Sequence, residues 1–303
     1  MKIVDALIHA AYEKQNPTIM GLDTRAEYLP AGFDMSDPQE CAHSIFEFNK
    51  QLIDGLADIV PAVKVQVAFY EMYGLHGMET LYKTLCYAKE AGLIVVADAK
   101  RGDIGSTAEA YSRAFLGQAA EDGLRDGFPA DMLTVNPYLG ADGIAPFLKD
   151  CARFDKGIFV LVKTSNPSSG EFQDLVCQGK PLYEHIAESV SRWGESLIGD
   201  CGYSDVGAVV GATYPEQGKY LREKFTHLYF LVPGYGAQGA TGKDLRGCFD
   251  ENGWGAIVNA SRSILCAHKQ SRLHFVDAAR QEALRMRADL LGTIGEIGRP
   301  FQV

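Results

Sequence analysis

The sequence predicts an α/β protein folded as one (β/α)8 TIM barrel, with residues 1–303 forming a single domain. Eight short apolar segments, typical of buried parallel strands, alternate with segments of helical periodicity. Nearly every apolar segment ends in polar or turn residues, and no Pro/Ser-rich linker interrupts the 303 residues. Because polar residues at successive strand ends can share one site at the top of a barrel, we expect a closed barrel rather than two Rossmann halves.

The predicted strands cover residues 18–23, 63–68, 93–98, 132–135, 157–162, 206–210, 228–232 and 256–259. Helical periodicity is clearest over residues 79–91, 107–121 and 183–197, and residues 1–12 have the pattern of an amphipathic helix. Turn-forming residues crowd the segments 24–38 and 171–181, which we expect to be loops over the barrel mouth. Strands and helices that alternate in this way build βαβ units around a parallel sheet.

Charge and composition narrow the classes of partner. The chain has 29 Lys and Arg against 39 Asp and Glu, and a net charge of −10 disfavours nucleic acid and anionic membranes. No segment approaches the roughly 18 consecutive apolar residues of a membrane span. Seven dispersed cysteines argue against a disulfide framework or a zinc knuckle, and seven unclustered histidines argue against a metal site. We therefore expect a cytoplasmic protein without a metal.

The third predicted strand carries the densest group of ionisable residues. Its apolar run leads directly into Asp98, Lys100 and Asp103. Because side chains alternate along a strand, Asp98 and Lys100 are expected on one face at its C-terminal end, where catalytic residues of α/β folds collect. The alternative is a structural ion pair that caps the strand; the third charge, at Asp103, favours catalysis.

Lysines also occur in, or directly after, two other predicted strands. Lys64 lies in an otherwise apolar alternation, where a buried ammonium needs a carboxylate such as Asp98, unless its side chain reaches the rim. Lys163 ends the fifth strand and fits either a Schiff-base lysine or, more commonly, a solvated lysine or one near a helix terminus. The following Ser165 and Asn166 suit a helix cap or turn, or hydrogen bonds to a planar substrate.

A glycine-rich turn follows the seventh predicted strand, with the spacing G-x-G-x-x-G at Gly234, Gly236 and Gly239. The preceding Pro233 and the weak helix start after the turn argue against a dinucleotide fingerprint. Backbone N–H groups of such a turn, together with Arg262 after the eighth strand, suit a phosphate, which TIM barrels commonly bind after strands 7 and 8. A purely structural turn is the other alternative.

Four sequence blocks together resemble the orotidine 5′-phosphate decarboxylase family. They are the D-x-K-x-x-D-I-x-x-T pattern from Asp98 to Thr107, the Lys-Val-Gln-Val-Ala-Phe-Tyr-Glu segment from Lys64, the Pro-Gly-Tyr-Gly-Ala-Gln-Gly turn from Pro233, and Ser-Arg-Ser around Arg262. The matches extend from residue 21 to residue 263. The chain length and the Thr-Ser-Asn-Pro block look like the longer bacterial branch of the family.

The resemblance implies a barrel that converts orotidine 5′-phosphate to UMP and carbon dioxide in pyrimidine (UMP) biosynthesis, without a metal or an organic cofactor. It implies that Lys64, Asp98, Lys100 and Asp103 form an alternating charge network. Lys100 is the expected proton donor, because a fixed ammonium stabilises charge that develops on the carbon losing carbon dioxide.

The resemblance also implies where the rest of the substrate binds. Asp23 would contact the ribose, Ser165 the pyrimidine, and Gln238 with Arg262 the phosphate, with Pro233 beside them. It further implies a homodimer with shared active sites, in which Asp103 and Thr107 reach into the site of the partner subunit.

Two other interpretations stay open. A lyase or synthase of the related phosphate-binding barrels would share the D-x-K-x-x-D core, act on a sugar phosphate and often use a metal. A nucleotide-binding module would keep the phosphate site without the chemistry. Turnover of orotidine 5′-phosphate in EDTA, without turnover of ribulose or hexulose phosphates, would favour the decarboxylase over the lyase or synthase. Release of carbon dioxide would favour it over the nucleotide-binding module.

Overall fold

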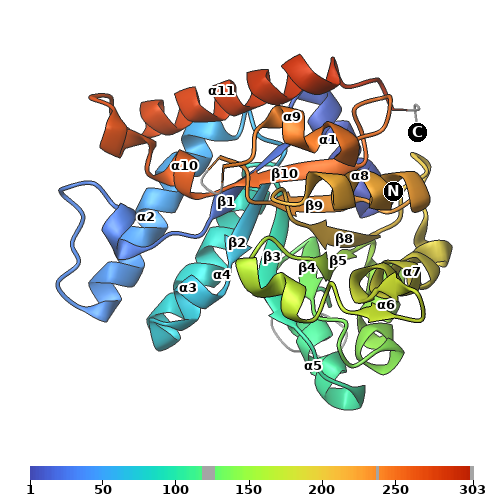
Figure 1. Ribbon diagram of the computed structural model, residues 1–303. Helices are drawn as coiled ribbons and strands as arrows, with labels where there is room; N and C mark the ends of the chain where they lie inside the picture. Colours follow the sequence, from blue (N-terminus) through green and yellow to red (C-terminus); the bar gives the residue numbers. More distant parts are fainter. Residues whose placement is uncertain (118–126, 237–238, 301–303) are drawn as a thin grey trace.

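The computed structural model describes residues 1–117, 127–236 and 239–300. Eight parallel strands close into a barrel in the order β1-β10-β9-β8-β5-β4-β3-β2, and helices surround it (Figure 1). The predicted (β/α)8 barrel is thereby confirmed.

The barrel strands correspond to the eight predicted apolar segments, with bounds that differ by at most three residues. They are β1 (Thr18–Leu22), β2 (Ala62–Gln66), β3 (Ile94–Arg101), β4 (Met132–Val135), β5 (Gly157–Lys163), β8 (Val206–Val210), β9 (Phe230–Pro233) and β10 (Ala256–Ala260). The largest difference is in β3, which continues through its charged residues to Arg101.

The predicted helices are also present, and the structure adds others that periodicity did not single out. The α-helices are α1 (Ile3–Glu13), α2 (Pro38–Leu56), α3 (Ala68–Glu71), α4 (Gly74–Glu90), α5 (Gly105–Phe115), α6 (Ala141–Phe154), α7 (Leu182–Gly194), α8 (Pro215–Lys224), α9 (Gly242–Leu245), α10 (Arg262–Leu265) and α11 (Phe275–Ile294). Short 3-10 helices are η1 (Ala26–Tyr28), η3 (Pro167–Glu171), η4 (Glu195–Leu197), η5 (Arg246–Cys248) and η6 (Ala267–Gln270). The helix predicted over 107–121 ends at Phe115, and residues 118–121 lie outside the described residues.

Strand alternation divides the barrel side chains between two apolar environments. Val96, Phe159 and Ile257 pack together inside the barrel, whereas Val95 and Val160 pack on the outside, in the layer shared with the helices. Both faces of the strands are therefore buried, which explains their nearly continuous apolar sequences. The side chains inside the barrel change from apolar to polar toward the C-terminal ends of the strands. The candidate site therefore lies at that end of the barrel.

Helix α1 closes the opposite, N-terminal end of the barrel. Its Ile3, Val4 and Leu7 belong to the interior cluster, and Ile3 lies against Gly157, the first residue of β5. The amphipathic helix expected at the N-terminus thus packs its apolar face under the strands. The C-terminal end of the barrel is left as the open end.

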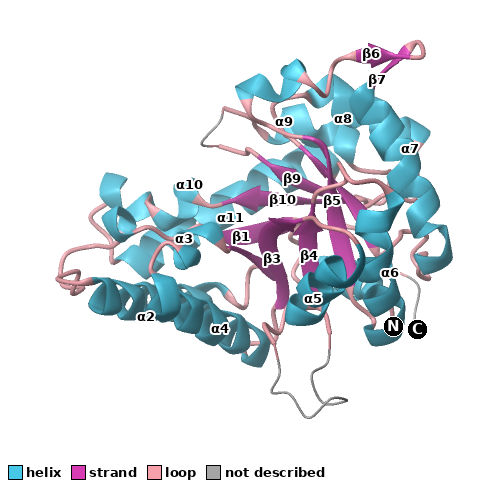
Figure 2. Ribbon diagram, turned by 90° about the horizontal axis from the view of Figure 1, so that it is seen from below, coloured by secondary structure: helices cyan, strands magenta, loops and turns pink. Residues whose placement is uncertain are grey.

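One of the two predicted mouth loops is more ordered than expected. Residues 171–181 contain the antiparallel pair β6 (Val176–Cys177) and β7 (Lys180–Pro181), which projects from the barrel (Figure 2). Its two-residue turn, Gln178-Gly179, has φ of 51° and 83°, as the tight turns of hairpins require. Gln-Gly is a weaker turn signal than Asn-Gly, so a plain loop was the wrong prediction here.

The described helices include none that is long and apolar enough to cross a membrane. All seven cysteines are free thiols, as their scattered positions predict.

Candidate functional site

A cavity of about 660 Å³ lies at the C-terminal ends of the barrel strands. All eight strands, or the segments that follow them, contribute to its lining, as expected for the active face of a TIM barrel. The lining residues are Asp23, Lys64, Gln66, Asp98, Lys100, Thr134, Leu161, Thr164, Ser165, Asn166, Gln173, Val209, Leu231, Pro233, Gly234, Tyr235, Asn259, Ser261 and Arg262.

Four of the predicted site residues form a chain of alternating charges in this cavity. Asp98 accepts hydrogen bonds from Lys64 Nζ on Oδ2 at 2.9 Å and from Lys100 Nζ on Oδ1 at 2.6 Å. Lys64 Nζ also donates to Asp23 Oδ1 at 2.9 Å. The expected pairing of Lys64 with Asp98 is confirmed, and Lys64 is buried rather than extended to the rim.

These contacts fix the protonation states of the buried pair. Burial alone would raise the pKa of Asp98, but the ammonium groups of Lys64 and Lys100 outweigh it and hold that pKa well below its usual range. Burial likewise opposes the charge of Lys64, yet Asp23 and Asp98 raise its pKa above the usual value. Both groups therefore stay charged through the neutral range.

The backbone of β3 departs from a regular strand to place Lys100. The pairing of β3 with β4 shifts register between Ala97 and Arg101, and Lys100 has a left-handed φ of 49°. Thr134 on β4 stabilises this bend: its Oγ1 accepts from Lys100 N at 2.9 Å and donates to Asp98 Oδ1 at 2.8 Å. Such a backbone costs a non-glycine residue roughly 1–2 kcal/mol, a strain typical of functional sites.

Three further predicted residues, Ser165, Pro233 and Arg262, line the same cavity. Ser165 comes close because β8 is followed by Gly211, at which an added Cβ would lie 2.7 Å from Ser165 Cα. Thr213 Oγ1 also donates to the carbonyl of Ser165 at 3.2 Å. The segments after β5 and β8 are therefore packed directly against each other at this point.

Two predicted residues, Asp103 and Thr107, are not brought into the cavity, and a third is not described. Asp103 and Thr107 are absent from its described lining; Asp103 Oδ1 instead accepts from Ile104 N at 2.8 Å, and Thr107 is exposed on α5. Gln238 lies outside the described residues. The predicted roles of Asp103, Thr107 and Gln238 in the site therefore stay predictions.

Lys163 matches neither the Schiff-base nor the solvated interpretation of its position. It is fully buried rather than solvated, and its Nζ donates to Asp174 Oδ1 at 2.7 Å. It is also not among the described residues that line the cavity, so a Schiff base with a ligand there has no support. The more common expectation, a solvated lysine, is wrong.

Several cavity residues were not singled out from the sequence. Gln66 Nε2 donates to Asp98 Oδ2 at 3.0 Å, and its position two residues after Lys64 on one strand was the available signal. Asn259 is 6% exposed, and its Oδ1 has no hydrogen-bond partner among the described residues, so this oxygen could accept a hydrogen bond from a bound molecule. Gln173 comes from the segment between β5 and α7, where no pattern pointed to it.

The glycine-rich turn lies at the edge of the cavity, after β9. Gly234, Gly236 and Gly239 all have positive φ, of 109°, 69° and 92°, a conformation that favours glycine. The strand belongs to a closed barrel and the next helix, α9, has four residues, so the turn is not the βα turn of a Rossmann fold.

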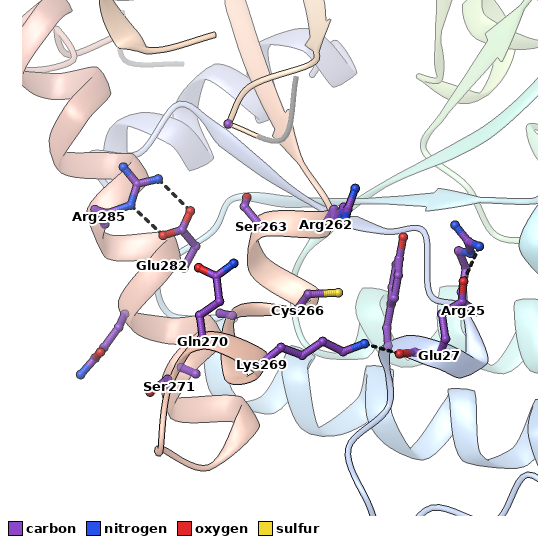
Figure 3. Close-up of a pocket in the computed structure, with 15 residues that line it drawn as sticks. Arg25, Glu27, Arg262, Ser263, Cys266, Lys269, Gln270, Ser271, Glu282 and Arg285 are labelled. Carbon is purple, nitrogen blue, oxygen red and sulfur yellow. Dashed lines mark hydrogen bonds and ion pairs between the residues drawn. The ribbon is translucent and has the colours of Figure 1, made fainter. Parts of the chain in front are cut away.

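A second, larger cavity of about 1140 Å³ adjoins this turn and shares Arg262 with the first (Figure 3). Most of its charged side chains already have partners: Arg285 pairs with Glu282, Arg25 pairs with Glu27, and Lys269 donates to the carbonyl of Glu27. Arg262 lines both cavities, and its guanidinium can donate hydrogen bonds to an anion where they meet.

Within the described ranges, no three His, Cys, Asp or Glu side chains are grouped so as to hold a metal ion.

Comparison with known proteins identifies the family. Residues 18–272 match the model of the "Orotidine 5′-phosphate decarboxylase / HUMPS family". The orotidine 5′-phosphate decarboxylase of Caldicellulosiruptor bescii is 47% identical over 273 residues, covering 88% of this chain and 90% of that protein. That of Rhodopirellula baltica is 46% identical over 286 residues, covering 91% and 94%. These bacterial relatives share nearly the full length of the chain.

Solved structures agree with the barrel. Leishmania donovani OMP decarboxylase superposes with a TM-score of 0.74 at 31% identity, covering 96% of this chain and 100% of the other. The orotidine 5′-monophosphate decarboxylase of Methanocaldococcus jannaschii, solved with the inhibitor BMP, is similar in fold, with a TM-score of 0.59 at 19% identity, covering 89% of this chain and 99% of the other. From the family match and the sequence identities, the chain belongs to the orotidine 5′-phosphate decarboxylase / HUMPS family.

Proposed function

We propose that this chain decarboxylates orotidine 5′-phosphate to UMP in pyrimidine biosynthesis, with Lys100 as the proton donor. The observation that carries the proposal is the Asp23–Lys64–Asp98–Lys100 series, held at hydrogen-bonding distance at the mouth of the barrel. Nearly full-length relatives with this name support the choice of substrate.

The proposed reaction needs no group beyond these side chains. The bond from the pyrimidine carbon to the carboxylate breaks, carbon dioxide leaves, and the electron pair stays on that carbon. The Lys100 ammonium stabilises this charge and then transfers a proton to the same carbon. Asp98, fixed by Lys64, Gln66 and Thr134, holds the Lys100 side chain in place by accepting a hydrogen bond of 2.6 Å from its Nζ. The lysine regains its proton from solvent, since its side chain is 45% exposed.

The substrate is proposed to lie across the cavity from β1 to β10. Asp23 would bind the ribose hydroxyls, Ser165 the pyrimidine, and Arg262 the phosphate together with Gln238, next to Pro233. Binding energy from the phosphate can orient the reacting carbon over Lys100 although the phosphate itself does not react.

We further propose a cytoplasmic homodimer in which Asp103 and Thr107 complete the site of the partner. Exposed apolar side chains support an interface near these residues. Leu75, Ile104 and Tyr138, in the segments after β2, β3 and β4, are 87%, 53% and 89% exposed. Large apolar side chains exposed on three neighbouring segments are typical of a surface that a partner covers.

The direct test is loss of orotidine 5′-phosphate absorbance on adding the purified protein in EDTA, with carbon dioxide measured in parallel. We expect turnover with the chelator present and none with ribulose or hexulose phosphates. Turnover of a sugar phosphate alone would show that the chain is a lyase or synthase of sugar phosphates instead. Nucleotide binding without release of carbon dioxide would show that it is a nucleotide-binding protein without decarboxylase activity.

A further inference from the structure

The β5 strand ends in a buried charge that the proposed chemistry does not use. The side chain of Lys163 is 0% exposed. Its Nζ donates to Asp174 Oδ1 at 2.7 Å and to Ser169 Oγ at 3.2 Å, and lies 4.2 Å from the centroid of the Tyr214 ring. These three contacts satisfy the ammonium with a carboxylate, a hydroxyl and an aromatic face.

A register shift separates Lys163 from the cavity. The pairing of β5 with β8 is irregular between Leu161 and Lys163. Leu161 lines the cavity, whereas Lys163 lies beside Tyr214 and, at 5.8 Å, beside the ring of Tyr183 on α7. The lysine therefore lies behind the cavity wall.

That wall is the segment 164–174, which carries both lysine partners. Thr164 and Gln173 close it into a loop, because Thr164 N donates to Gln173 Oε1 at 2.9 Å and Gln173 Nε2 donates to Thr164 Oγ1 at 2.8 Å. Thr164, Ser165, Asn166 and Gln173 all line the cavity.

The buried charge makes the position of this loop obligatory. If the loop moved away, Lys163 would lose Ser169 and Asp174 together and leave an unpaired ammonium against apolar residues, which is strongly unfavourable. Tyr214 also holds the loop: its hydroxyl accepts a hydrogen bond from Ser169 Oγ at 3.0 Å and donates one to the carbonyl of Asn166 at 3.4 Å.

We propose that Lys163 is a positioning residue that holds the loop 164–174 against the pyrimidine, and so determines how well the protein recognises the base. This inference rests on the proposed function, in which Ser165 contacts the pyrimidine. Lys163 acts through the loop and touches no substrate atom.

The test compares UMP with ribose 5-phosphate, which keeps the ribose and phosphate but lacks the base. For Lys163→Met, which keeps the apolar stem and removes the charge, we expect UMP binding by calorimetry to weaken about 10-fold, as for loss of a charged hydrogen bond. The KM for orotidine 5′-phosphate should rise in parallel, and ribose 5-phosphate binding should change less than about 2-fold. Equal weakening of both ligands, or unchanged UMP binding, overturns the inference.

Two matched variants separate the possible failures. Lys156→Met removes another lysine near β5, at its opposite end, where it pairs with Asp131; it should leave UMP binding unchanged. Ser165→Ala tests the pyrimidine contact itself: if it has no effect, the proposed contact fails, whereas a clear effect without one from Lys163→Met rejects only the role of Lys163.

A third variant applies if Lys163→Met does not fold. Asp174→Asn changes the partner whose side chain is 46% exposed, so the fold tolerates it better. It should weaken UMP binding at least about 3-fold, with ribose 5-phosphate unaffected, because a neutral amide holds the ammonium less firmly. Unaltered UMP affinity in this variant counts against the proposal.

Discussion

Lys100 Nζ lies 2.6 Å from Asp98 Oδ1, although only one residue separates the two along β3. The contact depends on the left-handed backbone at Lys100, which Thr134 stabilises from the next strand. The ammonium is therefore held by its neighbour and by its backbone before any substrate binds. Preorganisation of this kind avoids the cost of reorienting charges during the reaction.

Replacing this ammonium should remove catalysis while largely sparing binding. Lys100→Ala is expected to lower kcat by at least roughly 10⁴-fold, since both charge stabilisation and the proton are lost. UMP affinity, measured by calorimetry, should stay within about 10-fold, because the other contacts remain. Lys83→Ala, at an exposed ion pair with Glu79, is the control. Near-normal turnover of Lys100→Ala would reject the assignment.

If Arg262 binds the phosphate, its replacement should affect only substrates that carry a phosphate. Arg262→Ala is expected to lower kcat/KM for orotidine 5′-phosphate about 100-fold, the size of a lost charged hydrogen-bond pair. Turnover of orotidine, which has no phosphate, should not change. Arg285→Ala provides the matched control, because Arg285 lines only the second cavity and pairs with Glu282. An equal loss for both substrates would place Arg262 elsewhere in the reaction.

Shared sites predict complementation between two inactive variants. Asp103→Ala and Lys100→Ala should each be inactive alone, yet a mixed dimer would contain one site with Lys100 from one chain and Asp103 from the other. Random mixing should then restore about a quarter of the wild-type activity, because half of the dimers are mixed and each has one intact site. Measured activity that stays at the level of the separate variants would show that Asp103 acts within its own chain.

The low pKa of Asp98 predicts how stability responds to acid. The folded-state pKa lies below the unfolded value, so the carboxylate stabilises the fold above the unfolded pKa, and this contribution disappears as pH falls toward the folded pKa. The difference in unfolding free energy between wild type and Asp98→Asn should thus be constant from pH 8 to pH 5 and shrink only below about pH 4. Urea denaturation at several pH values checks this; a difference that already narrows at pH 6 would contradict it.

Asp205 should show the opposite behaviour. Burial raises its pKa to about 7, although Val4 N donates to its Oδ1 at 3.0 Å. A raised pKa stabilises the fold below the unfolded value, and this contribution is lost as pH rises to about 7. Asp205→Asn keeps the acceptor for Val4 N but cannot ionise. Its free energy of unfolding should therefore rise by about 2–3 kcal/mol relative to that of wild type between pH 5 and pH 8. Parallel stability curves would contradict this.

The grouping of Lys64, Asp98 and Lys100 could be predicted because it follows from the alternation of side chains along single strands. Strand alternation places Lys64 and Gln66 on one face, and it predicts the same for Asp98 and Lys100. The bend at Lys100 could not be foreseen, since it depends on Thr134 in the neighbouring strand. Lys163 was misjudged for the same reason: its burial depends on Asp174 and Tyr214, which no periodicity relates to it. Long-range contacts decided both the bend at Lys100 and the burial of Lys163.

The alternation inside β3 also sets which kinds of genetic change this site can survive. A point substitution alters one side chain. Deletion of one residue of β3 before Asp98 would turn each following side chain of the strand to the opposite face. The carboxylate would then face the apolar layer under the helices, and Ala99 would take its place in the cavity. Length variation among descendants of this chain should therefore be confined to the connecting segments, with the strand lengths held fixed.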